Sequence, residues 1–398
     1  MHTIVVDLGF GDAGKGTMVD ALCDRTGASL VVRFSGGCQA AHNVVTDDGR
    51  HHTFAQFGSG TFQGARTFLS RHMMVEPLSM MLEHDALGDQ LLGRDVFVDR
   101  EALVTTPFHW LVNRFEEFRL GHGSTGRGIG TTARYALEHP DAPIVGDLAY
   151  PERIGPKLEA LQQWYEGLVD PDWRSTVDLK QLVEQYDQWC RTYRVVDGEW
   201  LQDELDAGPV IFEGSQGVLL DEWYGFHPHT TWATTTNANA LELLDGREAE
   251  TIGVVRTFTT RHGAGPLPTE DEGLDITLGT REAHNVGGFA GRFRFGHFDA
   301  VLHDYALSVC PVDRLAVTHL DWPALKVCIG YEDAAFLVAN RNRDLAYQEK
   351  LTKQLFDAKP LYHRFGFDVG DEIADMLGVP LAATSHGPKT GDKVWRGN

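Results

Sequence analysis

Short apolar runs recur along the chain, and each is followed by a turn that is rich in glycine or polar residues. The first run, Ile4–Leu8, is interrupted only by Asp7 and leads into a glycine turn, after which Met18–Leu22 has a helical pattern. Four further runs of strand type follow at Leu30–Phe34, Val210–Phe212, Ile252–Phe258 and Ala316–Asp321. Strand, glycine turn and helix in this order predict an α/β protein around a mostly parallel central sheet.

The pattern changes in the segment Tyr150–Trp200, which is predicted to be helical. Its aromatic side chains are expected to pack in the core, and they are Trp164, Tyr165, Trp173, Trp189 and Tyr193. No repeat, low-complexity tract or obvious linker divides the chain. With 398 residues, it can form one large domain or two or three smaller ones.

The turn after the first strand, Gly9–Thr17, fits two phosphate-binding patterns at once. One is the dinucleotide fingerprint G-x-G-x-x-G, and the other is the phosphate-binding loop G-x-x-x-x-G-K, which ends at Lys15. A dinucleotide site requires an acidic residue about twenty positions later, but Val31–Ser35 contains none. The pattern therefore favours a phosphate-binding loop, followed by a helix whose positive end faces the anion.

Two residues distinguish this turn from an ordinary phosphate-binding loop. Gly16 stands where a serine or threonine would bind magnesium. Asp12 places a carboxylate among phosphates, which repel it unless a metal neutralises the charge. Asp12 is therefore predicted to be a magnesium ligand, a catalytic base, or both.

Several later turns carry side chains that suit nucleotide binding. Ser35–Ala41 leads to His42 at the C-terminal end of a strand, where open parallel sheets bind ligands. Ser124–Thr132 combines hydroxyls, glycines and an arginine, which fits either a phosphate site or an ordinary surface loop. Gln216 and the segment Thr384–Pro388 lie in two further polar turns.

Charged and imidazole side chains mark three other positions. His227 and His229 form a His-x-His pair, but no third ligand lies nearby in the sequence, which disfavours zinc. Arg292 and Arg294, on a glycine-flanked loop, could together bind a small dicarboxylate. Asp321 ends a predicted strand and could accept hydrogen bonds from the amide edge of a purine.

Composition narrows the class of protein further. A net charge of −22 and a pI near 5.2 argue against general nucleic-acid binding, which needs a basic face. The five cysteines form no C-x-x-C pair and indicate free thiols in a reducing compartment. Without an apolar signal region or a stretch long enough to span a bilayer, the chain is expected to be cytoplasmic.

Taken in order, these stretches resemble the adenylosuccinate synthetase family nearly end to end. The matches are GDAGKG for the family's GDEGKG, GGCQAAH for GGxNAGH, STGRGIG for TTGRGIG, FEGSQGVLLD for FEGAQGTLLD, TRHGAGPLPTE for TRVGAGPFPTE, THLD for TKLD and SHGP for STGP. The resemblance implies a single domain over residues 1–398, a homodimer and no membrane or nucleic-acid partner. It also implies Mg²⁺ as cofactor, GTP as co-substrate, and aspartate and a purine nucleotide as the other substrates.

The resemblance also implies roles for the catalytic residues. Asp12 would take the proton from purine N1 and would bind the metal together with Ala41. His42 would act as the acid beside the transferring phosphoryl group, and Lys15 would stabilise the same charge. Gln216 would hold the edge of the base near its 6-oxygen.

The remaining positions would bind substrates. Gln39, Thr125 and Thr231 would hold the 5′-phosphate of the acceptor, Asp321 the guanine of GTP, and Arg292 with Arg294 the aspartate. The whole set implied for nucleotide and phosphate binding is Gly11, Gly14, Gly16, Gln39, Thr125, Thr231, His319, Asp321, Ser385 and Gly387.

The chain departs from the family pattern at several of these positions. Ala13 replaces a glutamate, Gln39 an asparagine and His319 a lysine, while Phe289 and Ala290 fall near two threonines that grip aspartate in the family. The arginine that the family lends across its dimer has no evident equivalent, and the nearest candidate is Arg134.

Three functional hypotheses follow. The favoured one is a GTP- and Mg-dependent ligase that phosphorylates the 6-oxygen of IMP or a close analogue and then joins L-aspartate to it. A related alternative is a specialised or viral paralogue that acts on a different acceptor or amino donor. A second hypothesis, a purine-nucleotide sensor with weak catalysis, is disfavoured because Asp12, Lys15, His42 and Gln216 are all present. A third, a dehydrogenase, is disfavoured because no acidic residue follows the glycine loop at the required distance.

Overall fold

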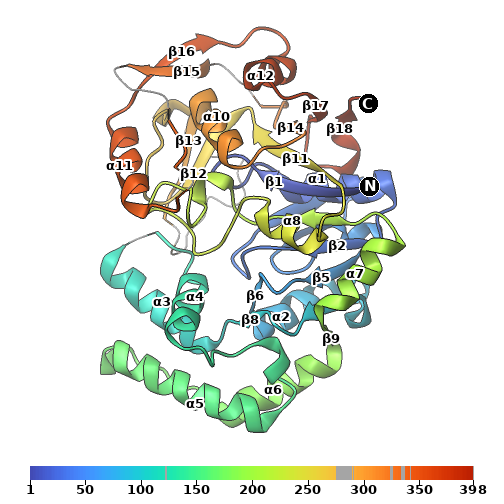
Figure 1. Ribbon diagram of the computed structural model, residues 1–398, viewed down its shortest axis with the longest axis vertical. Helices are drawn as coiled ribbons and strands as arrows, with labels where there is room; N and C mark the ends of the chain where they lie inside the picture. Colours follow the sequence, from blue (N-terminus) through green and yellow to red (C-terminus); the bar gives the residue numbers. More distant parts are fainter. Residues whose placement is uncertain are drawn as a thin grey trace.

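The computed structural model describes residues 1–121, 123–274, 289, 291–322, 326–332, 337–340 and 342–397. Ten strands form the main sheet (Figure 1), and every neighbouring pair is parallel except β17 and β18. In spatial order they are β18 (Lys393–Trp395), β17 (Leu381–Ser385), β14 (Arg314–Thr318), β11 (Ala249–Arg256), β1 (His2–Asp7), β10 (Ile211–Glu213), β2 (Leu30–Arg33), β5 (Arg66–Leu69), β7 (Val96–Asp99) and β9 (Arg194–Val196). The predicted α/β class with a mostly parallel sheet is confirmed, whereas the single-domain extent over residues 1–398 stays a prediction.

Within the described ranges, three smaller sheets accompany the main one. The four-stranded sheet contains β12 (Phe258–His262), β13 (Phe293–Asp299), β15 (Lys326–Glu332) and β16 (Lys359–Arg364) in that order. The two-stranded sheets pair β3 (His42–Val45) with β4 (His51–Phe54), and β6 (Met74–Val75) with β8 (Leu103–Val104).

Helices cover both faces of the main sheet. This is shown by alternate side chains of β1, which enter different hydrophobic clusters. Ile4 and Val6 pack with residues of α7, α8, α10, α11 and α12, whereas Val5 packs with Met18 and Leu22 of α1. The described α-helices are α1 (Lys15–Thr26), α2 (Pro77–Leu87), α3 (Pro107–Leu120), α4 (Ile129–Glu138), α5 (Pro151–Leu168), α6 (Leu179–Thr192), α7 (Gly198–Ala207), α8 (Ala238–Leu244), α10 (Ala300–Val309), α11 (Leu345–Phe356) and α12 (Val369–Leu377). A sheet buried on both faces explains the near-continuous apolar strands of the sequence.

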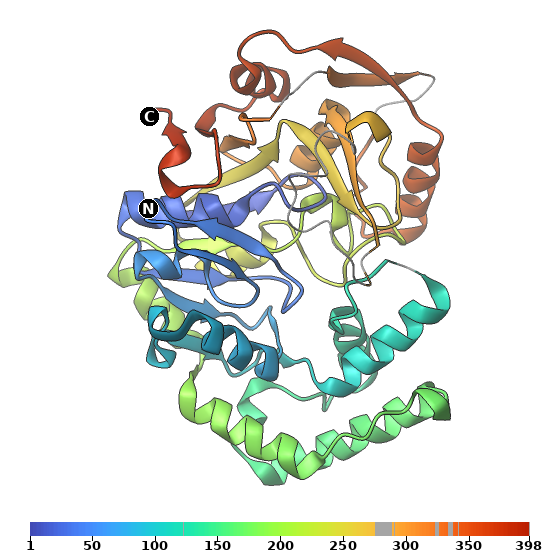
Figure 2. The same ribbon diagram turned by 180° about the vertical axis from the view of Figure 1, so that it is seen from behind.

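Helices α3 to α6 gather at the end of the molecule opposite the antiparallel strands β15 and β16 (Figures 1 and 2). Tyr165 and Trp189 are fully buried there, as predicted, but Trp173 is 41 % exposed and packs only at the edge. The predicted helical segment also contains β9, which forms one edge of the main sheet. Among the described residues, no helix combines the length and apolar character that a membrane crossing requires.

Two predicted strands have different limits in the structure. The run predicted from Ile252 to Phe258 is divided at Thr257, so that β11 belongs to the main sheet and β12 to the four-stranded one. The strand predicted to end at Asp321 ends at Thr318, because His319 adopts a positive φ of 60° and turns the chain. All five cysteines are free thiols, as predicted.

Stability should depend on the ionisation of Asp299, the buried N-cap residue of α10. Its carboxylate accepts hydrogen bonds from Tyr331 Oη at 2.7 Å and from the backbone N–H of Leu302, yet burial raises its pKa from 3.8 to about 7. An acid whose pKa is raised by folding stabilises the fold fully below its unfolded pKa, and this contribution is lost as the pH rises through 7.

We therefore expect Asp299→Asn to flatten the fall in the free energy of unfolding between pH 4 and pH 8. Urea denaturation of both proteins across this range measures the difference in slope. Parallel pH profiles for the two proteins would contradict the assignment.

Candidate active site

The C-terminal ends of six adjacent strands of the main sheet, β17, β14, β11, β1, β10 and β2, bring the candidate residues together. In an open parallel sheet, this edge is where ligands bind. Asp12, Gln216 and Asp321 lie in loops that start there, Ser385 ends β17, and His42 begins β3 after the turn that follows β2. These residues lie far apart in the sequence. The arrangement confirms that the glycine turns of the sequence meet at one edge of one sheet.

Asp7, at the end of β1, organises the phosphate-binding loop from within. One carboxylate oxygen accepts the N–H groups of Gly9 and Gly11 at 2.8 and 3.3 Å, and the other accepts the N–H of Ala13 at 2.8 Å. The second oxygen also pairs with Lys15 Nζ at 3.0 Å, and Lys15 donates to the carbonyl of Gln216 at 2.6 Å. A buried carboxylate therefore fixes both the turn and its lysine.

Helix α1 begins directly after this loop and packs against His42. Gly14 caps the helix with a φ of 94°, which favours glycine at this position. A Cβ on Gly16 would lie 2.8 Å from Cβ of His42, which is closer than two non-bonded carbon atoms approach each other in proteins. The missing serine or threonine of an ordinary phosphate-binding loop is thus explained by the close approach of β3.

The Asp12 carboxylate projects from the loop and keeps 35 % of its surface exposed. Its backbone φ is +61°, and Arg256 donates a hydrogen bond to its carbonyl at 3.2 Å. His262 Nε2 lies 3.4 Å from Asp12 Oδ2. Burial tends to raise the pKa of Asp12, but the hydrogen bond from His262 and the positive charges of Lys15 and Arg256 lower it to about 2. The carboxylate is therefore ionised at neutral pH.

His42 lies at the start of β3 and is paired with Glu213 at the end of β10. Nδ1 of the imidazole is 2.5 Å from Glu213 Oε1, and Ser59 donates both its N–H and its hydroxyl to the same carboxylate. Burial tends to raise the pKa of Glu213, but Arg33 and His42 lower it to about 2. Burial lowers the pKa of His42 itself. The imidazole Nε2 is buried and has no hydrogen-bond partner among the described residues.

Gln39 and Gln216 present further buried polar atoms to the same region. Both polar atoms of the Gln39 side chain, and Oε1 of Gln216, have no hydrogen-bond partner among the described residues. Gln216 also adopts a positive φ of 52°. Buried polar atoms are nearly always satisfied in folded proteins, so these atoms are available for hydrogen bonds to a ligand.

Three segments predicted to hold the acceptor phosphate converge beside Gln39. Cys38 Sγ donates to the carbonyl of Arg127, and a Cβ on Gly37 would lie 2.7 Å from the side chain of Ile129. A Cβ on Gly130 would meet Trp232 at 2.9 Å. Three segments therefore lie side by side. They are the Ser35–Ala41 turn, the start of α4 together with Thr125 before it, and the loop that contains Thr231.

The residues predicted to read the guanine base come together at the ends of β14 and β17. Leu320 donates its N–H to the carbonyl of Ser385 at 3.1 Å, and Ser385 donates its hydroxyl to the carbonyl of Gly387. Asp321 is exposed, and the Nδ1 of His319 lies 2.8 Å from the hydroxyl of Thr318. The same Thr318 hydroxyl donates to the carbonyl of Ala13, which joins this region to the phosphate-binding loop.

The two arginines predicted to bind the amino donor have unequal environments. Arg294 lies within β13 rather than on a loop, and its guanidinium donates to both oxygens of Glu270 and to the carbonyls of Gly263 and Gly265. Arg292, which precedes the strand, pairs with the same glutamate at 2.9 Å but is 59 % exposed. Because four donor interactions already engage Arg294, Arg292 is the better placed to meet an incoming carboxylate.

Of the remaining residues that depart from the family pattern, the structure describes Phe289 and Arg134. Phe289 packs against the glycine-rich loop, because a Cβ on Gly126 would lie 2.7 Å from its ring. Ala290 lies outside the described residues. Arg134 pairs with Glu116 of its own chain at 2.9 Å and stacks on Trp164.

A magnesium ion fits this site through the carboxylate of Asp12. Mg²⁺ commonly binds one or two carboxylates, substrate phosphates and water, so one ionised carboxylate beside a phosphate-binding loop is sufficient. Ala41, the other predicted ligand, is exposed directly before His42. No cluster of three His, Cys, Asp or Glu side chains that could hold a metal occurs within the described ranges, and this includes the surroundings of His227 and His229.

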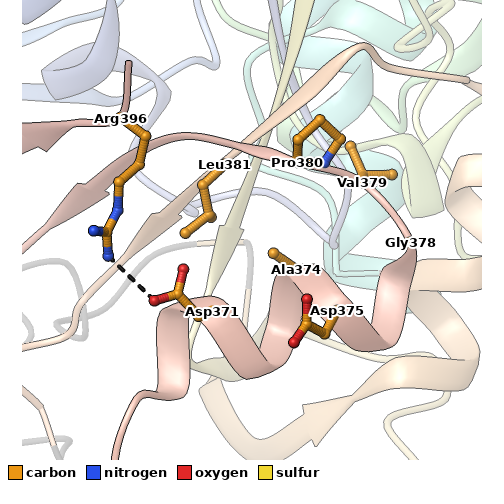
Figure 3. Close-up of a pocket in the computed structure, with 8 residues that line it drawn as sticks. All are labelled: Asp371, Ala374, Asp375, Gly378, Val379, Pro380, Leu381 and Arg396. Carbon is orange, nitrogen blue, oxygen red and sulfur yellow. Dashed lines mark hydrogen bonds and ion pairs between the residues drawn. The ribbon is translucent and has the colours of Figure 1, made fainter. Parts of the chain in front are cut away.

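Of two surface cavities formed by described residues, one lies away from the group just described and the other lies beside it. A cavity of about 450 Å³ lies between α12 and the first residue of β17 (Figure 3), with an ion pair between Arg396 and Asp371. It is at the N-terminal edge of the sheet, opposite Ser385. A second cavity, of about 480 Å³, is bordered by Arg292, Phe118 and Phe289.

Sequence reasoning did not assign roles to four residues that build the site. Asp7 holds the phosphate-binding loop, and Glu213 pairs with the imidazole of His42. His262 contacts the carboxylate of Asp12, and Arg33 donates to Ser215 in the turn after β10. Three of them carry a recognisable signal, because a charged residue that ends an apolar strand run is unusual. His262 follows its strand and carries no such signal.

Comparison with known proteins gives consistent results. The family model for adenylosuccinate synthetase matches residues 4–367. The adenylosuccinate synthetase of Symbiobacterium thermophilum is 32 % identical over 350 residues, which cover 82 % of this chain and 80 % of the relative. The structure of fully ligated adenylosuccinate synthetase from Plasmodium falciparum superposes with a TM-score of 0.84 at 20 % identity and full coverage of both chains. The succinoaminodeoxyadenylate synthetase of cyanophage S-2L, solved with dGMP and dATP, covers all of this chain and 95 % of its own with a TM-score of 0.67 at 18 % identity.

Proposed function

Because this chain belongs to the adenylosuccinate synthetase family, we propose that it is a GTP-dependent ligase that joins L-aspartate to IMP or a close analogue. The reaction forms a carbon–nitrogen bond at the purine 6-position. The observation that carries the proposal is the meeting of an ionised Asp12 and a buried His42–Glu213 pair beside the N-terminus of α1.

These groups fit an activation step followed by an amination step. Asp12 takes the proton from purine N1, so that the 6-oxygen attacks the γ-phosphate of GTP. His42 Nε2 faces the transferring phosphoryl group, while Glu213 orients the imidazole and stabilises its positive form. The amino group of aspartate then displaces the phosphorylated oxygen. Mg²⁺, when bound at Asp12, would neutralise the phosphate charge.

The same geometry supports a proposed position for each substrate. The unsatisfied amide of Gln39, with Thr125 and Thr231, would hold the acceptor phosphate, and Gln216 would hold the base near its 6-oxygen. Asp321 would accept the N1–H and N2–H of guanine, and the exposed Arg292 would bind the donor carboxylate. We further propose that the protein acts as a cytoplasmic homodimer.

The test is steady-state phosphate release with IMP, GTP and aspartate, with the succinylated product identified by mass. We expect turnover with GTP to exceed turnover with ATP. Equal or faster turnover with ATP would contradict the role of Asp321, and an absence of product with every purine monophosphate and amino acid tested would contradict the function.

Arg292→Leu should raise the apparent KM for aspartate about tenfold or more, because hydrogen bonds to a charged group contribute about 1.5–3 kcal/mol. The KM for GTP should stay nearly constant. A matched control is Arg396→Leu, which breaks an exposed arginine–carboxylate pair at the opposite edge of the sheet (Figure 3). If an uncharged amine replaces aspartate while aspartate is inactive, the arginine site binds something other than a donor carboxylate.

A further inference from the structure

The contact between His262 and Asp12 joins two different sheets of the protein. His262 is the last residue of β12 in the four-stranded sheet, whereas Asp12 belongs to the loop that follows β1 of the main sheet. The imidazole Nε2 lies 3.4 Å from Asp12 Oδ2. In the family motif TRVGAGPFPTE this position is valine, which cannot donate a hydrogen bond. The contact is therefore a feature of this chain rather than of the motif.

Asp12 depends on this contact for the orientation of its carboxylate. Its backbone is fixed by the positive φ and by the hydrogen bond from Arg256 to its carbonyl. Its side chain, however, has one ion-pair partner among the described residues, which is His262. Without that partner, a carboxylate that is 35 % exposed could turn about its Cα–Cβ and Cβ–Cγ bonds.

The imidazole is itself held in place. Its ring lies against Phe293, with 4.5 Å between ring centroids, and its Nδ1 is buried without a partner in the described ranges. Because the carboxylate can only accept, the contact requires a proton on Nε2 of His262. The residues after His262 also bear on the donor site, since the carbonyls of Gly263 and Gly265 hold Arg294.

We propose that His262 is a positioning residue that fixes Asp12 through an Nε2–H···Oδ2 hydrogen bond and leaves Oδ1 to face the purine ring. This inference rests on the proposed function for the role of Asp12. It assigns to His262 no contact with substrate and no proton transfer. The proposal also makes the orientation of the Asp12 carboxylate depend on β12, which pairs with β13, the strand that contains Arg294.

Three substitutions of His262 distinguish the contributions of its two ring nitrogens. His262→Val removes both, His262→Gln places an amide N–H near the position of Nε2, and His262→Asn places one near Nδ1. We expect His262→Val to lower kcat about tenfold with each KM within about twofold of wild type, because one hydrogen bond to a charged group is lost. His262→Gln should restore most of kcat, and His262→Asn should not.

The matched control is His297→Gln in the neighbouring strand β13. His297 pairs with Asp271 at 3.0 Å in the same four-stranded sheet, and its substitution should leave kcat unchanged. Thermal denaturation verifies that each variant is folded. Wild-type kcat in His262→Val, or rescue by Asn rather than by Gln, would overturn the proposal.

A second measurement does not depend on activity. Histidine labelled with ¹⁵N should show His262, assigned from the signal missing in His262→Gln, with a proton on Nε2. An Nδ1–H tautomer would overturn the positioning role even if wild-type turnover is normal. Absence of wild-type turnover would count against the proposed function, while the tautomer would still decide the contact.

Discussion

Asp12→Asn should lower kcat by about a hundredfold or more, the range in which loss of a general base usually falls. Asparagine has nearly the shape of aspartate and can tolerate the positive φ of 61°, so the loop should keep its conformation. What the substitution removes is the negative charge, and with it the group that accepts the purine proton. The affinity for GTP, measured by calorimetry without magnesium, should rise, because the carboxylate that repels the phosphates is gone.

Asp24→Asn serves as the control for this substitution, because Asp24 is exposed on the same helix that the loop introduces. It removes one negative charge without touching the loop, and kcat should stay at the wild-type value. Near-normal turnover in Asp12→Asn would show that the proton leaves the purine by another route.

His42→Asn should also lower kcat by about a hundredfold or more. The imidazole Nε2 is buried and unpartnered among the described residues, so the structure gives it no evident role except toward a ligand. Asparagine at this position can still contact Glu213 but cannot hold a proton against a phosphoryl oxygen. The measurement is kcat at saturating GTP, IMP and aspartate.

Glu213→Gln distinguishes the chemistry of His42 from its packing. The glutamine carbonyl can still accept the Nδ1–H, so the ring stays oriented while the charge that stabilises its protonated form is lost. We expect an intermediate fall in kcat of about tenfold. His51→Asn on the adjacent strand β4 is the control, since His51 is exposed and should not affect turnover. Equal losses in His42→Asn and His51→Asn would point to damage to the hairpin rather than to the site.

Much of this site could be predicted because its residues stand at strand ends. Asp12, His42 and Gln216 each lie in a turn that follows an apolar run, and parallel strands place such turns at one edge. Every side chain of β1 is buried, and alternate ones enter clusters on opposite faces of the sheet, which explains why the run is so apolar. The sequence therefore indicated both the class of the fold and the place where its loops meet.

What the sequence could not indicate is which side chains pair across the sheet. Lys15 pairs with Asp7 and with the carbonyl of Gln216. His42 pairs with Glu213, and Asp12 pairs with His262. Most of these contacts join residues more than 170 positions apart, and no local pattern encodes them. The predicted end of β14 was wrong for a different reason. The chain turns at the positive φ of His319, and this conformation is uncommon in residues other than glycine.

The position of β1 between β10 and β11 has a consequence for how the chain folds during synthesis. Thr3 pairs with Ile211 and with Glu250, so the first strand has no neighbour in the sheet until more than half of the protein has left the ribosome. Closing loops of this length is slow, and it exposes unpaired strand edges in the meantime. The phosphate-binding loop, although encoded first, should be among the last parts of the nascent chain to become ordered.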